Sequence, residues 1–312
     1  MKASPGSSHS QCWVGSAIAP KRLSSIIGSL RATLQGIGVM SEQTMTVGTL
    51  GGPATFAGQA TAVMLEQYSQ LGEVSYFPSI EAVLEALAGG NVEAIILSEQ
   101  TTRTGFGEID ELLVPPNSKI HVVAESVVPY GCSLLVKPGT RMSDIRGVLG
   151  HGSIRQCRRF LDENLPGVDS AIHSKNSVEA AREVATGDGS LAVVGTRKNA
   201  EMADLEILAT DIDDGAAAAW WAMSLAPHFS QTPSRLVVGG RLGGDGSVGR
   251  LICDLNESGY TLRTLFSQPT GVEIFEHDYL LMLGGSGRLA DVKRVLQGHK
   301  NARLVGAFEG SS

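Results

Sequence analysis

The stretch VGTLGGPATFAGQA, residues 47–60, sets a glycine-rich turn between a short apolar run and a helical pattern. The run indicates a strand, and the pattern that begins at Phe56 indicates a helix. Gly51, Gly52 and Thr55 occupy the turn, where free backbone amides and a hydroxyl group can hold an anion. The stretch therefore predicts one strand–helix unit of an α/β fold with binding groups at its turn.

Apolar runs and helical patterns continue to alternate up to about residue 210. Further strands are predicted within 74–78, 92–98, 121–138, 148–153 and 190–195. Helices are predicted at 56–68, 79–90, 154–164 and 177–187, the second with Ser79 as its N-cap and a glycine after it. Strands that alternate with helices indicate a mostly parallel α/β architecture.

After Pro227 the pattern changes to strand, helix, strand, strand, helix, strand. This order is typical of the ferredoxin-like βαββαβ unit. Residues 45–230 are therefore predicted to form a two-lobed domain with its second lobe at about 121–210, and residues 233–308 a smaller domain. The segment APHFSQTP, residues 226–233, is the expected linker.

The composition restricts the partners. The chain has 312 residues, 42% of them hydrophobic, and a net charge of −7, which argues against nucleic-acid binding. An anionic substrate must then be held by a local cluster of Arg or Lys. The four cysteines are scattered without metal-ligand spacing, which indicates reduced thiols in a cytoplasmic protein and no metal site. No apolar run is long enough for a membrane span.

The first 44 residues are rich in Ser and Gly and lack a continuous apolar region after a basic start. We expect a disordered extension, or a true start at Met40 or Met45, in preference to a signal peptide.

Four short stretches carry candidate site residues at strand ends and helix starts. They contribute, in order, Gly52, Thr55 and Phe56; Glu99, Gln100 and Thr101; His151 and Ser153; and Asn176 and Ser177.

In this order and spacing the four stretches resemble the motifs of the prephenate dehydratase family, approximately L-G-P-x-G-T-F, P-I-E-N-S, S-H-P-x-x-x-x-Q-C and S-T-A-x-A-A. The C-terminal βαββαβ unit resembles the ACT regulatory domain of that family. The resemblance implies two lobes of the periplasmic-binding-protein type (type II), with the active site in the cleft between them. It also implies prephenate or a close analogue as the substrate, and a homodimer or a dimer of dimers formed through the ACT domains. No cofactor is expected.

The chain departs from the family most clearly in DIDDGAAAAWWAMSLAP, residues 211–227. Here the family has I-x-D-x-x-x-N-x-T-R-F, whose Thr and Arg are its catalytic and carboxylate-binding residues. Those places fall on Trp220, Trp221 and Ala222, so the Thr-Arg-Phe motif is lost. Two adjacent tryptophans form either the wall of a pocket or part of a packed core, and we take them as a pocket wall that binds substrate.

Loss of this motif changes the expected chemistry. Dehydration of prephenate expels carbon dioxide and the ring hydroxyl group, which requires a proton donor and a cation for the ring carboxylate. A tryptophan pair supplies neither, whereas an apolar wall still permits loss of carbon dioxide. The chain is thus closest in logic to the non-aromatising prephenate decarboxylases, a branch of the family associated with antibiotic-type pathways. A genuine dehydratase and a catalytically dead ligand-binding protein are the alternatives.

The candidate residues receive roles on this basis. Glu99, His151 and Thr55 are the proposed catalytic groups, although His151 is equally well explained as a cap at a strand end. Three arginines, Arg155, Arg158 and Arg159, share one helix face, which is either solvated or replaces the lost cation.

The ACT-like domain is altered as well. Residues 246–248 read G-S-V in place of G-A-L, and residues 266–269 read F-S-Q-P in place of E-S-R-P. Because these elements contact phenylalanine in regulated members of the family, we expect phenylalanine sensing to be lost.

Overall fold

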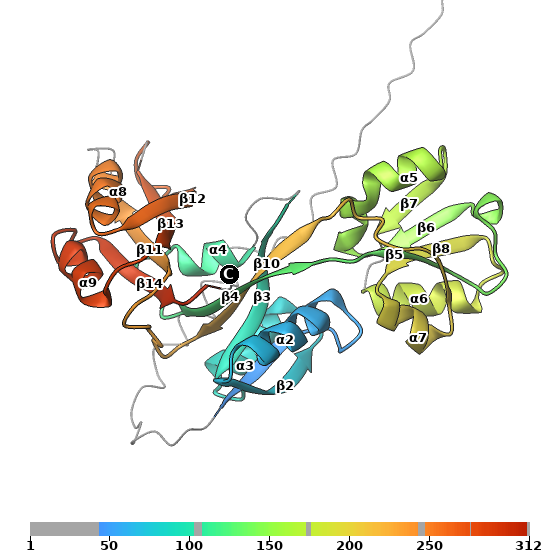
Figure 1. The fold of residues 1–312 in the computed structure, drawn as a ribbon, viewed down its shortest axis with the longest axis horizontal. Helices are drawn as coiled ribbons and strands as arrows, with labels where there is room; N and C mark the ends of the chain where they lie inside the picture. Colours follow the sequence, from blue (N-terminus) through green and yellow to red (C-terminus); the bar gives the residue numbers. More distant parts are fainter. Residues whose placement is uncertain (1–43, 103–107, 173–175, 243–246, 275, 311–312) are drawn as a thin grey trace, which may run out of the picture.

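The computed structural model describes residues 44–102, 108–172, 176–242, 247–274 and 276–310. The extension expected at the N-terminus therefore lies outside the described residues, except for residue 44. The described strands form one nine-stranded and one five-stranded sheet. Figure 1 shows the C-terminal domain at one end of an elongated molecule and the second lobe at the other, with the first lobe between them.

The first lobe is built on five strands of the larger sheet. β1 (Met45–Leu50), β2 (Leu71–Phe77) and β3 (Ala94–Thr101) are parallel. β10 (Ala217–Ser224) lies between β3 and β4 (His121–Pro129) and runs antiparallel to both. The sequence analysis had assigned β4 to the second lobe. This assignment is corrected by its pairing with β10, since both strands leave the first lobe to reach the second.

Helices α2 (Phe56–Gln67) and α3 (Ile80–Ala88) begin where their capping residues predict. The Thr55 hydroxyl accepts a hydrogen bond from the Gly58 amide, and the Ser79 hydroxyl accepts one from the Ala82 amide. A third helix of this lobe, α4 (Glu108–Leu113), follows β3.

The two faces of the sheet around β10 carry separate apolar cores. On one face, α2 packs Ala57, Ala60 and Met64 against a cluster that includes Trp220. On the other face, residues of α3 and α4 pack in a cluster that contains Trp221. Successive side chains of a strand point to opposite faces, so two adjacent tryptophans cannot lie in the same layer.

The second lobe contains the smaller sheet, in the order β7-β6-β8-β5-β9. Its strands are β5 (Ser133–Val136), β6 (Gly147–Gly150), β7 (Asp169–Ile172), β8 (Leu191–Gly195) and β9 (Glu206–Ala209). Its helices are η1 (Met142–Asp144), η2 (Gly152–Cys157), α5 (Arg158–Asn164), α6 (Ser177–Thr186) and α7 (Arg197–Ala203). The single helix predicted at 154–164 is thus a 3₁₀ turn followed by a short α-helix, and no side chain caps either start.

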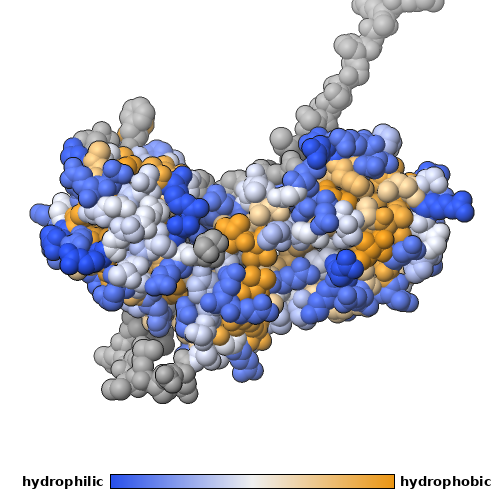
Figure 2. Space-filling model, in the orientation of Figure 1, coloured by the Kyte–Doolittle hydropathy of each residue, from blue (hydrophilic) through white to orange (hydrophobic). Residues whose placement is uncertain are grey.

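The C-terminal domain has the predicted βαββαβ order. Its elements are β11 (Arg235–Leu242), α8 (Ser247–Glu257), β12 (Tyr260–Pro269), β13 (His277–Gly285), α9 (Leu289–Gln297) and β14 (Ala302–Phe308). The strands lie in the order β12-β13-β11-β14, and β14 joins β4 where Gly306 pairs with Val122. Figure 2 shows this domain as mostly hydrophilic on the face in view, whereas apolar side chains gather over the other two parts.

One core cluster crosses from the first lobe into the C-terminal domain. It contains Trp221 and Val122 from the first lobe together with Val237, Leu280 and Phe308 from the C-terminal domain. The two parts therefore share buried apolar surface in addition to the edge of their sheet.

We expect Phe308→Ala to lower the free energy of unfolding by about 3–5 kcal/mol, the usual cost of emptying a buried aromatic site. Because the cluster is shared, calorimetry should show the first lobe and the C-terminal domain unfolding together at a lower temperature. Phe308→Leu, which retains most of the volume, should lose much less. A low-temperature transition of the C-terminal domain alone would contradict the shared core.

Candidate active site

A cavity of about 930 Å³ lies between the two lobes. Leu50 and Phe77, the last residues of β1 and β2, line it on the first lobe. His151 and Ser153 line it on the second lobe. Ligands of open α/β sheets bind at the carboxyl ends of parallel strands, so the position of this cavity is typical of a binding site.

Three α-helices direct their N-termini at the cavity. Their N-caps are Thr55 for α2, Ser79 for α3 and Asn176 for α6, and all three residues line the cavity. Each helix start carries free amide groups and a partial positive charge, which favours anions. Glu81, in the first turn of α3, also lines the cavity and makes that end less suitable for an anion. The ends of α2 and α6 are therefore the better anion sites.

The described residues that line the cavity include neither Arg nor Lys. The local cationic cluster expected for an anionic substrate is thus not found among them. Arg158 pairs with Asp162 at 3.8 Å and Arg159 with Asp214 at 2.6 Å, and both arginine side chains are largely exposed. The solvated reading of that helix face is the one that the geometry supports.

The structure brings seven of the predicted site residues together at the cavity. They are Thr55, Phe56, His151, Ser153, Asn176, Ser177 and Trp220. His151 occupies the N-cap position of η2 without a capping bond from its side chain, which supports the site reading over the capping one. The buried Ser153 hydroxyl has no hydrogen-bond partner among the described residues. An unsatisfied buried hydroxyl is rare and suits a group that a ligand completes.

The Thr55 hydroxyl group is already engaged at the turn. It donates to the Gly52 carbonyl oxygen at 2.8 Å and accepts from the Gly58 amide at 3.1 Å. Thr55 is therefore a cap that orients the helix end, and it has no proton to spare for catalysis. Gly52 shapes this turn and does not itself line the cavity.

The same turn touches the second lobe. The Ala54 carbonyl oxygen accepts hydrogen bonds from Thr196 Oγ1 at 2.9 Å and from Asn199 Nδ2 at 3.1 Å, and both bonds are buried. Farther along, Gln156 Nε2 donates to Thr101 Oγ1 at 3.3 Å. Thr101 thus joins the lobes but does not line the cavity.

Tyr130 is a cavity residue that the sequence analysis missed. It lies between β4 and β5, where the chain crosses between lobes, and its amide donates to the Ala216 carbonyl at 3.0 Å. Its ring meets Phe56 edge to face, with 5.1 Å between centroids. Burial, followed by the charge of Cys132, raises the pKa of Tyr130 to about 12, so the phenol stays protonated. The signal available was the break between the two strands within 121–138.

The expectation that both tryptophans line the cavity is corrected by half. Trp220 lines it and is 6% exposed, whereas Trp221 is 0% exposed and lies in the other layer of the sheet. The Trp221 indole Nε1 donates to Glu125 Oε2 at 3.1 Å. An arginine at position 221, as the family has, would likewise face Glu125 and not the cavity.

Glu99 and Gln100 are not among the cavity residues. Glu99 is 2% exposed and occupies a bulge of β3, because Ala219 pairs with Gln100 and Trp220 with Ser98. Burial raises its pKa from 4.5 to about 8, with further upward contributions from Asp110 and Glu125. The raised pKa agrees with the expectation for a buried carboxyl group, but its location does not support direct contact with substrate.

The fold and the cavity define a two-lobed α/β protein of the periplasmic-binding-protein type. Residues 47–220 match the family model described as "Prephenate dehydratase". The chain belongs to the prephenate dehydratase family.

Individual relatives agree with this assignment. A bifunctional chorismate mutase/prephenate dehydratase of Neisseria gonorrhoeae is 24% identical over 275 residues, covering 82% of this chain and 71% of that protein. Prephenate dehydratase of Arthrobacter aurescens, solved in complex with L-Phe, superposes with a TM-score of 0.68 at 22% identity, over 85% of this chain and 90% of that one. A protein described as a novel type of quorum quenching acylase, GqqA, superposes with a TM-score of 0.69 at 19% identity, over 85% and 98%. At these identities the structural likeness shows the fold alone.

The raised pKa of Glu99 predicts a pH dependence of stability. The folded state keeps its proton up to about pH 8, whereas the unfolded chain releases it near 4.5, so stability falls between these values. The loss is at most about 5 kcal/mol for a shift of this size. Glu99→Gln should remove it, so that its melting temperature exceeds that of the wild type at pH 8 by more than at pH 5. Parallel melting curves across this range would contradict the assignment.

Proposed function

We propose that the protein is a prephenate decarboxylase that leaves the ring non-aromatic. The observation that carries the proposal is Trp220, which lines the cavity at the place where the family has its catalytic Thr. Without that hydroxyl group, no proton donor stands there to help the ring hydroxyl group leave. Loss of carbon dioxide needs no such donor.

Substrate binding follows from the helix ends and the aromatic walls. The N-termini of α2 and α6 hold carboxylate groups, while Phe56, Tyr130 and Trp220 pack around the ring. An apolar wall beside the ring carboxylate disfavours its localised charge more than the dispersed charge of the transition state. The same wall therefore both binds the ring and promotes loss of the carboxylate.

The reaction ends with a proton transfer. As the bond to the carboxylate carbon breaks, its electron pair moves through the ring diene, and a proton adds at a ring carbon. His151 is the proposed donor because it lines the cavity and histidine titrates near neutral pH. Tyr130, held protonated, serves as a hydrogen-bond donor to the substrate.

Prephenate dehydratase activity, giving phenylpyruvate, is the second candidate. The family model and the named relatives favour it. It would require another group to protonate the leaving hydroxyl, and His151 is the candidate for that role too. The identity of the product separates the two reactions.

Several features of the proposal go with the family and not with the cavity. The C-terminal domain is proposed to be an ACT domain that pairs copies of the chain and no longer senses phenylalanine. A cytoplasmic location and a reaction without cofactor are part of the same proposal. Within the described ranges, no helix is both long enough and apolar enough to cross a membrane, and no His, Cys, Asp or Glu cluster could hold a metal ion.

Incubation with prephenate at neutral pH should give a dihydro-4-hydroxyphenylpyruvate, with release of carbon dioxide and retention of the ring hydroxyl group. The product is identified by NMR and by the absence of the phenylpyruvate absorbance. Phenylpyruvate formed above the spontaneous rate would establish the dehydratase instead. Unchanged prephenate would leave a ligand-binding role.

Trp220→Thr should lower the rate of decarboxylation about tenfold, which corresponds to about 1.4 kcal/mol of transition-state stabilisation. A small fraction of aromatic product should accompany it, because the hydroxyl group returns to the cavity. Since Trp220 also packs against α2, thermal unfolding must be recorded beside the product analysis. Trp220→Phe, which keeps an apolar ring, is the control and should retain decarboxylation. Equal rates for Thr and Phe at this position would remove Trp220 from the mechanism.

A further inference from the structure

Glu125 stands at the contact between the first lobe and the C-terminal domain. It lies on β4 directly opposite Trp221 of β10, and its side chain is 13% exposed. A carboxylate this far from water needs charged or hydrogen-bonding partners. Its partners come from both sides of the contact.

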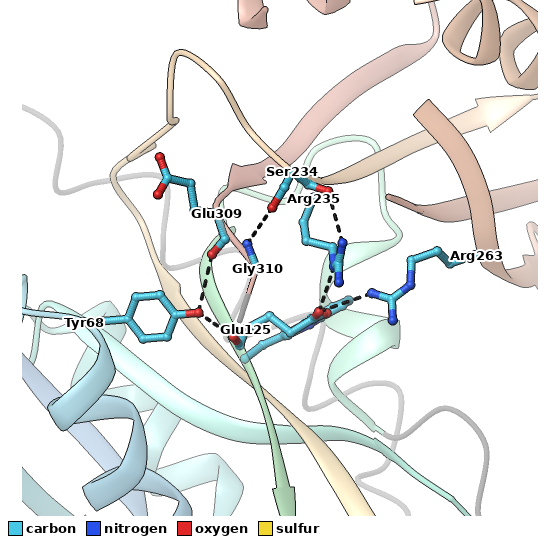
Figure 3. A network of polar contacts seen from close by, with 8 residues as sticks. Tyr68, Glu125, Ser234, Arg235, Arg263, Glu309 and Gly310 are labelled. Carbon is cyan, nitrogen blue, oxygen red and sulfur yellow. Dashed lines mark hydrogen bonds and ion pairs between the residues drawn. The ribbon is translucent and has the colours of Figure 1, made fainter. Parts of the chain in front are cut away.

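The two carboxylate oxygens are divided between the two domains. Oε2 accepts the Trp221 indole N–H at 3.1 Å. Oε1 accepts hydrogen bonds from Arg235 Nε and from an Arg263 guanidinium nitrogen, each at 3.3 Å. Figure 3 shows both guanidinium groups, from β11 and β12, pointing at this carboxylate. The side chain that anchors Trp221 is therefore itself held by two arginines of the C-terminal domain.

A second contact of Glu125 reaches α2. The Tyr68 hydroxyl donates to the Glu125 carbonyl oxygen at 2.5 Å and lies 3.4 Å from the Glu309 carbonyl oxygen (Figure 3). Tyr68 caps the C-terminus of α2, whose N-terminus carries Thr55 at the cavity. The surroundings of Glu125 thus touch two elements that form the cavity wall.

β10 needs a side-chain anchor where Trp220 lies. Its ladder with β3 is irregular between Ala219 and Trp220, and its ladder with β4 shifts between Ala222 and Met223. Bulges let a strand twist and redirect its side chains. Between these two irregularities the backbone pairing alone determines the direction of Trp220 less strictly than in a regular strand.

We propose that Arg235 and Arg263 are positioning residues of the cavity, which fix Trp220 through Glu125 and Trp221. Neither arginine lines the cavity, so each acts only through its neighbours. The position that holds Arg in the family motif carries Trp221 here, and the C-terminal domain supplies the cations that Glu125 requires. The inference rests on the proposed function in one respect, because it concerns the wall of the same cavity.

Arg263→Met and Glu125→Gln should each lower kcat/KM for prephenate consumption about tenfold. The double variant should lose no more than either single variant, since both break the same link. Arg263→Lys, which keeps the charge, should restore most of the activity. Arg241→Met is the matched control: Arg241 is 43% exposed, against 47% for Arg263, and it pairs with Asp278 within the C-terminal domain. It should behave as the wild type.

A second readout follows Trp220 directly. Protein carrying Trp13→Phe and labelled with 5-fluorotryptophan contains two fluorine resonances, assigned by Trp220→Phe and Trp221→Phe. The Trp220 resonance should shift or broaden in Arg263→Met and return in Arg263→Lys, which loss of a merely structural contact would not produce. If Arg263→Met does not fold, Trp221→Phe tests the same link through a tenfold loss of activity.

The outcomes separate the two proposals. An unmoved Trp220 resonance in Arg263→Met, or an equal effect of Arg241→Met, would overturn the positioning role. Because the rate is measured as prephenate lost, the result does not depend on which product forms. If the wild type consumes no prephenate, the proposed function fails, and the resonances alone decide the inference.

Discussion

The alternation of side chains along β10 is the constraint on which the rest of the structure depends. The strand is paired on both sides, so each residue belongs to one of two layers. Trp220 belongs to the layer of α2 and the cavity, and Trp221 to the layer shared with the C-terminal domain. One dipeptide therefore takes part in both the site and the contact between domains.

The second physical feature is a cavity that can hold anions without a cation among its described lining. A helix terminus carries about half a unit charge, less than an arginine and without its five fixed donors. Two such ends, at α2 and α6, supply a positive potential that is spread over backbone amides. In a space largely closed to water these partial charges act strongly. For the proposed reaction, a diffuse potential binds the substrate while leaving its ring carboxylate free to depart.

Local signals in the sequence predicted much of this arrangement. Thr55, Ser79 and Asn176 mark helix starts, and the order of strands and helices predicted both the two lobes and the βαββαβ domain. The face on which a residue lies was harder to predict. Glu99 belongs to a bulge, which adds one residue and breaks the period of two from which orientation is inferred. Trp221 was misplaced because the tryptophan pair was treated as one unit, although the strand separates its members. Tyr130 was missed because nothing local shows that a tyrosine between two strands lies at the crossing between lobes.

The hydrogen bonds to the Ala54 carbonyl have a consequence for the traffic of molecules through the protein. Entry of a substrate requires the lobes to part, and parting separates one buried acceptor from the two donors on Thr196 and Asn199. Each group then stays unsatisfied until water reaches it, which makes opening slow in comparison with diffusion. A molecule enclosed in the cavity is retained for as long as this latch stays closed. Residence time, and not encounter, then sets how often the protein can exchange its contents with the solution.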